Sequence, residues 1–144
     1  MYSEYSMELD NLYQELIIDH GTHPRNFHTL ENANHDAEGF NPLCGDLVHV
    51  YVEIEDNIVK DISFTGKGCA ISTASASIMT DAVKGKSLAE VNSMFQQFQT
   101  LLTKDQETPN TLGKLTALAG VKKYPSRVKC ATLAWHTLQD ACKE

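Results

Sequence analysis

Hydrophobic residues in the first part of the chain recur at intervals of three and four positions. The recurring residues are Leu9, Leu12, Tyr13, Leu16 and Ile17. This spacing predicts an amphipathic helix over residues 7–20, which Gly21 and Pro24 end. Residues 21–41 are rich in Asn, His and Gly, and they predict a loop with one short edge strand.

Two runs in which apolar and polar residues alternate predict a β-hairpin. The runs span residues 47–54 and 58–65, with Val48, Val50, Val52 and Ile54 on one face of the first and Ile58, Ile62 and Phe64 on one face of the second. A three-residue loop over 55–57 sets Val50 opposite Ile62, and only Lys60 is then out of place. A two-residue loop sets Val50 opposite Ser63. The three-residue loop is favoured, with Asn57 in the left-handed conformation that such loops need.

Helical patterns fill the rest of the chain. The expected elements are a helix from about residue 69, a helix from 87, a polar loop over 104–110, a short helix ended by Gly120 and a last helix over 127–142. Ser87 and Glu90 have the spacing of a capping box. The sequence therefore predicts an α+β fold, in which an N-terminal helix and several C-terminal helices pack on a small antiparallel sheet of about three strands.

Composition and charge narrow the class of protein. The 144 residues are 42% hydrophobic and 22% charged, which suits one domain over residues 1–144. No apolar run approaches the ~18 residues of a membrane span. A formal net charge of -7 disfavours nucleic acid and anionic membranes as partners. The first twenty residues carry five acidic residues and no signal-peptide pattern, so a cytoplasmic location is expected.

Four cysteines in a cytoplasmic chain favour metal binding or thiol chemistry over disulfides. The three-residue hairpin loop sets Asp46 against Gly66. It also sets Cys44 against Gly68, whose next neighbour is Cys69. Because neighbouring strands lie about 5 Å apart, Cys44, Asp46 and Cys69 are expected to converge at one end of the sheet.

Cys69 and Cys130 are each expected at the start of a helix. There the helix dipole and nearby cationic side chains (Lys67, Arg127 and Lys129) lower the pKa of a thiol. Cys142 lies twelve residues after Cys130, or ~18 Å along a helix, and on its apolar stripe. It is therefore interpreted as a packing residue.

Three cysteines and one aspartate supply the four ligands of a tetrahedral zinc site. Spacing alone leaves open that Cys44, Cys69 and Cys130 are ordinary buried residues. The histidines are the weaker candidates. His20, His23, His28 and His35 are expected to be solvated, His49 to face outward on its strand and His136 to lie in the last helix.

Three segments together resemble the iron-sulfur cluster assembly family that includes IscU, the N-terminal domain of NifU, and SufU. They are residues 41–46 (NPLCGD), 66–72 (GKGCAIS) and 127–135 (RVKCATLAW), and weaker similarity covers nearly the whole chain. The SufU branch is the most similar. Lys129 stands where IscU has a histidine, the IscU chaperone-recognition segment is missing, and residues 112–125 resemble the SufU insertion.

The SufU resemblance implies a zinc-dependent sulfurtransferase. It implies a zinc site of Cys44, Asp46, Cys69 and Cys130, and a pyridoxal-phosphate cysteine desulfurase of the SufS kind as partner, with a downstream cluster scaffold. Cys44 is the favoured acceptor of persulfide sulfur. Asp46 is the harder ligand, and the site is expected to open there. Arg127 is expected to contact the desulfurase.

Two other functions use the same residues. The first is a scaffold on which a [2Fe-2S] cluster or iron is bound and then transferred, with Asp46 allowing release. The second is a purely structural zinc domain, which would unfold when zinc is removed. For Arg127 the alternative is an ordinary surface charge at the start of a helix.

Overall fold

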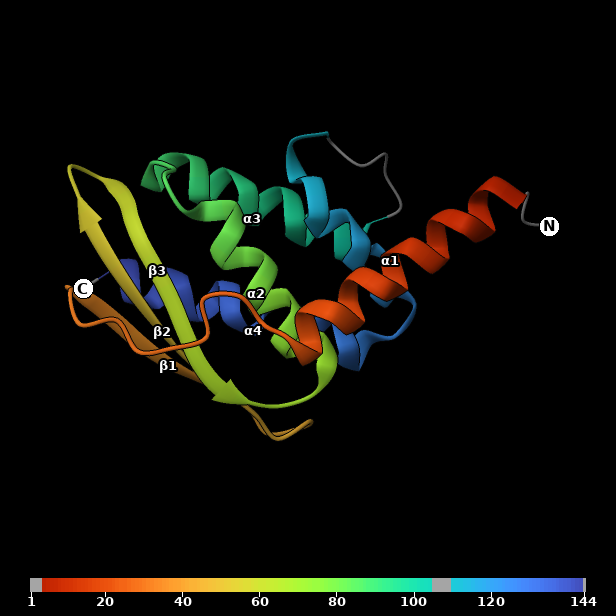
Figure 1. Ribbon diagram of the computed structural model, residues 1–144, viewed down its shortest axis with the longest axis horizontal. Helices are drawn as coiled ribbons and strands as arrows, with labels where there is room; N and C mark the ends of the chain where they lie inside the picture. The colour runs from red at the N-terminus through yellow and green to blue at the C-terminus, as the bar shows by residue number, and fades with distance from the viewer. Residues whose placement is uncertain (1–3, 105–109, 144) are drawn as a thin grey trace.

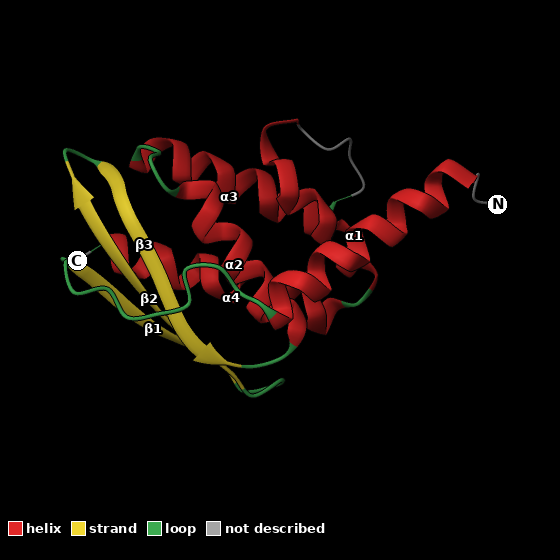
Figure 2. Ribbon diagram, in the orientation of Figure 1, coloured by secondary structure: helices red, strands yellow, loops and turns green. Residues whose placement is uncertain are grey.

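The computed structural model describes residues 4–104 and 110–143, and Figures 1 and 2 show its elements. In chain order they are α1 (Glu4–Thr22), β1 (His35–Asn41), β2 (Asp46–Glu55), β3 (Ile58–Lys67), α2 (Ala70–Val83), α3 (Leu88–Thr103), the 3-10 helix η1 (Asn110–Lys123) and α4 (Pro125–Cys142). The side chains of Leu9 and Leu12, and most of the predicted 104–110 loop, lie outside the described residues.

The three strands form one antiparallel sheet in the order β1-β2-β3, which confirms the predicted α+β fold. α4 packs on β1 and β2, and α2 packs on β3 and on α4. Figure 1 shows α1 on the side of α2 away from the sheet, while α3 begins beside the β2–β3 loop, where the Leu88 backbone N–H donates to the Asn57 carbonyl at 2.9 Å. No helix in the described ranges is long and apolar enough to cross a membrane.

Helix boundaries follow local chemistry. Ser87 accepts a hydrogen bond from the Glu90 backbone and the Glu90 side chain accepts one from the Ser87 backbone, so the predicted capping box is present. The prediction that Gly120 ends a short helix is wrong, because η1 continues to Lys123. The added turn brings Val121 into the hydrophobic core.

The predicted hairpin register is wrong by two positions. The loop has two residues, Asp56 and Asn57, both left-handed, as hairpin loops of this length require. A bulge then follows, in which Lys60 is the extra residue on β3 between the pairs Ile54–Val59 and Glu53–Asp61. Beyond the bulge Val50 pairs with Phe64 and Val52 with Ile62.

A shift of two positions keeps every side chain on its predicted face, because strand side chains alternate with a period of two. Val50, Ile62 and Phe64 are accordingly buried. The bulge inverts the alternation only next to the loop. There Val59 is buried and Ile58 is partly exposed, which reverses the prediction for Ile58.

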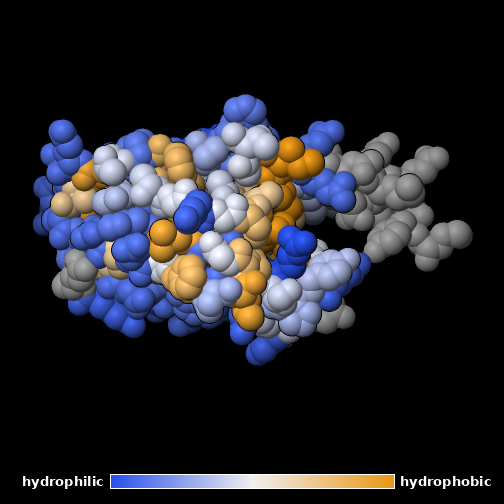
Figure 3. Space-filling view, turned by 90° about the horizontal axis from the view of Figure 1, so that it is seen from below, coloured by the Kyte–Doolittle hydropathy of each residue, from blue (hydrophilic) through white to orange (hydrophobic). Residues whose placement is uncertain are grey.

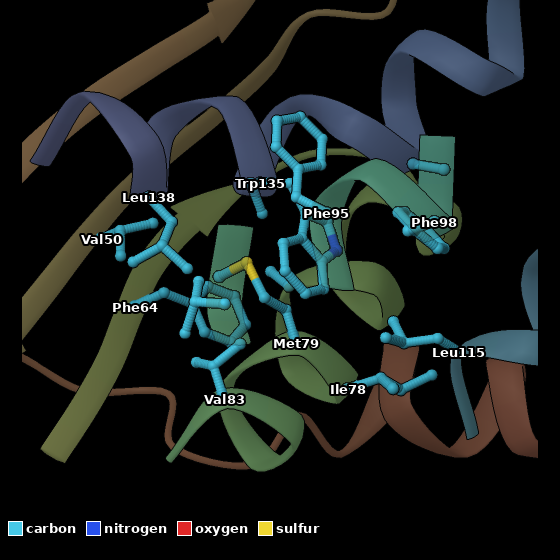
Figure 4. Packing of buried hydrophobic residues seen from close by; sticks show 14 of the residues in the cluster. Val50, Phe64, Ile78, Met79, Val83, Phe95, Phe98, Leu115, Trp135 and Leu138 are labelled. Carbon is cyan, nitrogen blue, oxygen red and sulfur yellow. The ribbon is translucent and has the colours of Figure 1, made fainter. Parts of the chain in front are cut away.

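The core lies between the sheet and the helices, around Trp135 of α4. Trp135 is fully buried, and its ring centroid lies 5.7 Å from that of Phe95 and 5.6 Å from that of Phe98, both on α3. Figure 4 shows these rings beside Met79 of α2, with Val50 and Phe64 entering from the sheet. This packing fixes α4, and with it Cys130, against the strands.

His20 is buried, although the sequence predicted a solvated residue. Its Nδ1 lies 2.7 Å from the Ser77 hydroxyl of α2, and that hydroxyl also accepts the Arg25 backbone N–H at 2.8 Å. Its Nε2 finds no hydrogen-bond partner within the described part of the chain. Burial lowers the pKa of His20, and the nearby charges of Arg25 and Lys114 lower it further.

We expect the protein to become less stable as the pH is lowered, because of His20. The folded state keeps the ring neutral while the unfolded state binds a proton below about pH 6.5, so the free energy of unfolding decreases below that pH. The slope from one such group is at most about 1.4 kcal/mol per pH unit. Urea unfolding at about pH 8 and about pH 5.5 should show a smaller loss for His20→Gln than for the wild type. The exposed His28→Gln is the control, and an equal pH dependence in both variants would contradict the assignment.

Candidate metal centre

The predicted site residues lie at one end of the sheet, at the lower edge of Figure 1. β1 ends at Asn41 and β2 begins at Asp46, and these two residues are paired in the sheet. The four residues between them form a tight turn that carries Cys44, and Gly45 takes a left-handed conformation in it. β3 ends beside this turn, and Cys69 follows directly before α2.

Cys44, Asp46 and Cys130 form the centre of the site. One donor atom from each lies within 4.8 Å of the other two, and the two sulfur atoms are 2.9 Å apart. Asp46 and Cys130 are buried, whereas Cys44 is exposed. The site therefore has two fixed interior donors and one donor that faces solvent.

The strand ends hold the Asp46 carboxylate in place. Its Oδ1 accepts the Cys69 backbone N–H at 2.8 Å. A methyl group at Gly68 would lie 2.4 Å from that same oxygen, so only glycine lets the chain pass this close. With Oδ1 engaged, Oδ2 is the oxygen that lies toward the sulfur atoms.

Cys69 lies at the edge of this group rather than inside it. Its Sγ is 4.0 Å from Asp46 Oδ2, and it also accepts the Ser72 backbone N–H at 3.4 Å as the N-cap of α2. The predicted approach of Cys69 to Asp46 is thus present in the structure. The predicted pairs Asp46–Gly66 and Cys44–Gly68 are absent, because the bulge sets Val48 opposite Gly66 and brings Asp46 beside Gly68.

The prediction that the helix start lowers the pKa of Cys130 is wrong. Burial raises the pKa of its thiol, and contacts with Cys44, Asp46 and Cys69 raise it further. The Cys130 thiol lies 2.9 Å from the Cys44 sulfur and 3.6 Å from the Ser126 carbonyl oxygen. A bound cation would reverse this effect, since a coordinating thiol loses its proton.

Asn41 is a further residue of the site, and the sequence pattern predicted no role for its side chain. Its amide nitrogen lies 3.5 Å from Asp46 Oδ2 and 3.7 Å from Cys130 Sγ, and its Oδ1 accepts the Leu43 backbone N–H at 3.2 Å. An asparagine before proline at the end of a strand signals only a turn. Its second contact depends on α4, 89 residues away, which no local pattern contains.

Arg127 lies one turn before Cys130 on α4, and it is exposed. It lines a groove together with Tyr13, Ile17, Ile71, Val121 and Tyr124. Cys142, in contrast, packs partly buried against the core at the far end of α4, and burial raises its pKa. The interpretation of Cys142 as a packing residue is confirmed.

The donor set fits a metal that prefers sulfur. Three cysteines and one aspartate oxygen are four donors, the number that zinc binds in tetrahedral sites. The burial of a carboxylate among thiols is unfavourable unless a cation balances the charge. The Cys69 N–H and the close approach of Gly68 engage Asp46 Oδ1, so Oδ2 is available to bind a metal ion.

The fold and the site define a small α+β protein with a cysteine-and-aspartate centre at the end of a three-stranded sheet. The chain belongs to the NifU-like N-terminal domain family, whose model matches residues 12–131. This result confirms the family expected from the three cysteine motifs.

Two curated relatives are similar along most of their length. The zinc-dependent sulfurtransferase SufU of Bacillus subtilis is 41% identical over 136 residues, covering 94% of this chain and 92% of its own. The iron-sulfur cluster assembly scaffold protein IscU of Streptococcus pyogenes is 41% identical over 138 residues, covering 94% of this chain and 86% of its own.

A solved structure agrees with this family. It is described as a putative iron-sulfur cluster assembly scaffold protein for the SUF system, from Fervidobacterium islandicum. It has a TM-score of 0.83 and 36% identity, and the match covers 88% of this chain and 93% of that one. The N-terminal part of a NifU-like protein from Brucella abortus, 22% identical with a TM-score of 0.82, shows the same fold.

Proposed function

We propose that this protein is a zinc-dependent sulfurtransferase that accepts persulfide sulfur from a cysteine desulfurase during iron-sulfur cluster assembly. The observation that carries the proposal is the arrangement of Cys44, Asp46 and Cys130, with donor atoms within 4.8 Å and only Cys44 exposed. The zinc-dependent sulfurtransferase SufU of B. subtilis, 41% identical, supports the same activity.

In the proposed site, Cys44, Asp46, Cys69 and Cys130 hold the zinc ion. Zinc keeps the coordinating thiols deprotonated near neutral pH and is itself redox-inactive. The protein positions the ligands through the Cys69 N–H bond to Asp46 and through α4, which carries Cys130. The same four residues are the ligands expected from the sequence.

Cys44 is the proposed acceptor of sulfur. Its thiolate attacks the outer sulfur of the desulfurase persulfide, so that one S–S bond breaks and another forms. The thiolate of the desulfurase cysteine leaves, and no external oxidant or reductant is consumed. An exposed thiolate on a turn can reach a partner protein, whereas the buried Cys130 is shielded from one.

The point at which the site opens is proposed to be Cys44. The sequence favoured Asp46, because a carboxylate is the weaker match in a sulfur-rich site. Asp46 is fully buried, however, and it is held by the Cys69 N–H. Release of Cys44 from the metal leaves no buried charge without a partner. It also frees the Cys44 thiolate, which is the proposed nucleophile.

The proposed partner is a pyridoxal-phosphate cysteine desulfurase of the SufS kind, with a cluster scaffold as later recipient of the sulfur. Two exposed hydrophobic residues, Phe40 and Leu43, come shortly before Cys44 in the chain, and the exposed Tyr124 precedes α4. Figure 3 shows hydrophobic residues among polar ones on the face seen from below. Arg127 adds a positive charge that suits an acidic patch on the desulfurase.

This thiol chemistry requires a reducing compartment, so we place it in the cytoplasm. The second candidate function is a scaffold that assembles and transfers a [2Fe-2S] cluster. The IscU scaffold protein of S. pyogenes, also 41% identical, favours it, and the same four residues would hold the cluster. The two functions differ in the metal that the site carries.

The deciding experiment compares zinc-loaded, metal-free and iron-loaded protein in a desulfurase turnover assay. We expect only the zinc-loaded form to stimulate turnover, because zinc is needed to keep the acceptor thiol deprotonated. Anaerobically purified protein should be colourless and should contain about one zinc per chain. Circular dichroism of the metal-free form tests whether loss of zinc merely unfolds the chain.

A coloured protein whose cluster is transferred to an apo-ferredoxin, with no effect of zinc on turnover, would establish the scaffold function instead. Unfolding on zinc removal, together with a desulfurase indifferent to the folded zinc form, would indicate a structural zinc domain.

A further inference from the structure

Asn41 is the polar side chain that links the buried donors of the site to the turn that carries Cys44. It is itself buried, with 6% of its surface exposed. Its side chain contacts the Leu43 backbone, the Asp46 carboxylate and the Cys130 sulfur. A buried amide is retained only where its donors and acceptor are used, so these contacts need an explanation.

The orientation of the Asn41 amide follows from its neighbours. The Leu43 backbone N–H can only donate, so the atom facing it must be the amide oxygen. The NH2 group then points to the other side, where it meets two acceptors, Asp46 Oδ2 and Cys130 Sγ. Both are atoms that the proposed site uses as ligands.

Cys44 receives no such support from Asn41. Its contact within the described residues is the Cys130 thiol at 2.9 Å, which would no longer carry a proton in a metal-loaded site. Hydrogen bonds to a thiolate or carboxylate stabilise the charged form and make it a poorer nucleophile. Asn41 thus distinguishes two ligands from the third.

We propose that Asn41 is a positioning residue that retains Asp46 and Cys130 in the metal site and leaves Cys44 as the reactive ligand. The NH2 group holds the two buried donors, while the oxygen fixes the turn so that Cys44 faces solvent. This inference rests on the proposed function for its purpose, the choice of sulfur acceptor. Its test uses the zinc-loaded protein without the desulfurase.

Two substitutions remove the NH2 group of Asn41, and only one of them also removes its oxygen. Asn41→Asp keeps an oxygen for the Leu43 N–H and removes the NH2 donor, whereas Asn41→Ala removes both. Asn34→Ala is the matched control, because Asn34 lies just before the same strand and bonds the Ile54 backbone through both its amide nitrogen and its oxygen. Asn34 is remote from the four proposed ligands in the sheet register.

The measurement is site-resolved alkylation of the zinc-loaded protein, read by peptide mass spectrometry, with Cys142 as internal reference. In the wild type Cys44 should react first and Cys130 should be protected. In both Asn41 variants the Cys130 rate relative to Cys142 should rise by about 10-fold or more, and zinc affinity should fall by about 10- to 100-fold. The cobalt-loaded variants should also show shifted thiolate-to-metal absorption bands.

An unchanged ratio of Cys130 to Cys44 modification in folded Asn41→Asp would overturn the proposal, as would zinc affinity equal to that of Asn34→Ala. An equal rise at all four cysteines, Cys142 included, would mean that Asn41 is merely structural. So would loss of folding in both Asn41 variants while Asn34→Ala folds. Failure of the proposed function would be seen in a different experiment, the turnover assay, in which zinc-loaded wild-type protein would not stimulate the desulfurase.

Discussion

Replacing Cys44 with alanine should remove nearly all stimulation of the desulfurase. In the group of Cys44, Asp46 and Cys130, Cys44 carries the only sulfur that faces solvent. The other sulfur, that of Cys130, is buried. Cys69 is half-buried, and its sulfur already contacts Asp46 Oδ2 at 4.0 Å and accepts the Ser72 N–H, so we expect it to be a poorer acceptor than Cys44. Turnover measured at saturating protein, with sulfide and alanine as products, checks this expectation.

The matched control is Cys142→Ala. Cys142 packs against the core at the other end of α4, so its loss should lower stability slightly and leave stimulation near the wild-type level. Mass analysis of the wild type after one turnover should find one added sulfur atom on the peptide that contains Cys44. Added sulfur on Cys69 or Cys130 instead, or near-normal stimulation by Cys44→Ala, would refute the acceptor assignment.

Most of the fold could be predicted from the sequence because apolar periodicity reflects which face is buried. Alternation around Val50 and Phe64 identified the core face of the hairpin, and the Ser87 capping box identified the start of α3. The register could not be derived in the same way. Shifts of two positions leave the buried face unchanged, so periodicity cannot tell them apart. Lys60, which alone broke the alternation, is the bulge residue.

The site could be predicted in part. The hairpin brings Asp46 and Cys69 together through backbone pairing, which sequence can anticipate. The contacts of Asn41 with Cys130 and of His20 with Ser77 join elements far apart in the chain. They depend on tertiary packing, and a single side chain carries no periodicity that would reveal them.

The pKa of Cys130 shows why an electrostatic argument from local structure can have the wrong sign. A helix start stabilises an anion by about 0.3 to 1 kcal/mol at exposed positions. Full burial can shift a pKa by about 3 to 5 units, equivalent to several kcal/mol. At 1% exposure, burial dominates for Cys130. Only a bound cation would restore the thiolate that the sequence predicted.

Introducing a methyl group at Gly68 should weaken zinc binding without disturbing the fold. The added carbon of Gly68→Ala would lie 2.4 Å from Asp46 Oδ1 and 3.0 Å from its carboxyl carbon. Asp46 cannot withdraw as a whole, because its backbone is paired with Asn41 at the start of β2. The carboxylate must therefore rotate, which breaks its bond from the Cys69 N–H. Zinc affinity should fall by about 10- to 100-fold in competition with a chromophoric chelator.

Gly120→Ala provides the control, because a methyl group at Gly120 meets no atom within 4 Å. It should bind zinc as the wild type does. The contrary result is a Gly68→Ala variant that has a lower thermal midpoint and keeps wild-type zinc affinity. That result would mean that glycine is needed at position 68 for packing, and that zinc binding by Asp46 does not require it. Lost affinity with an unchanged midpoint of the metal-free protein would instead mean that Gly68 is glycine so that Asp46 can hold its ligand position. A residue with no side chain would then determine how tightly the protein binds zinc.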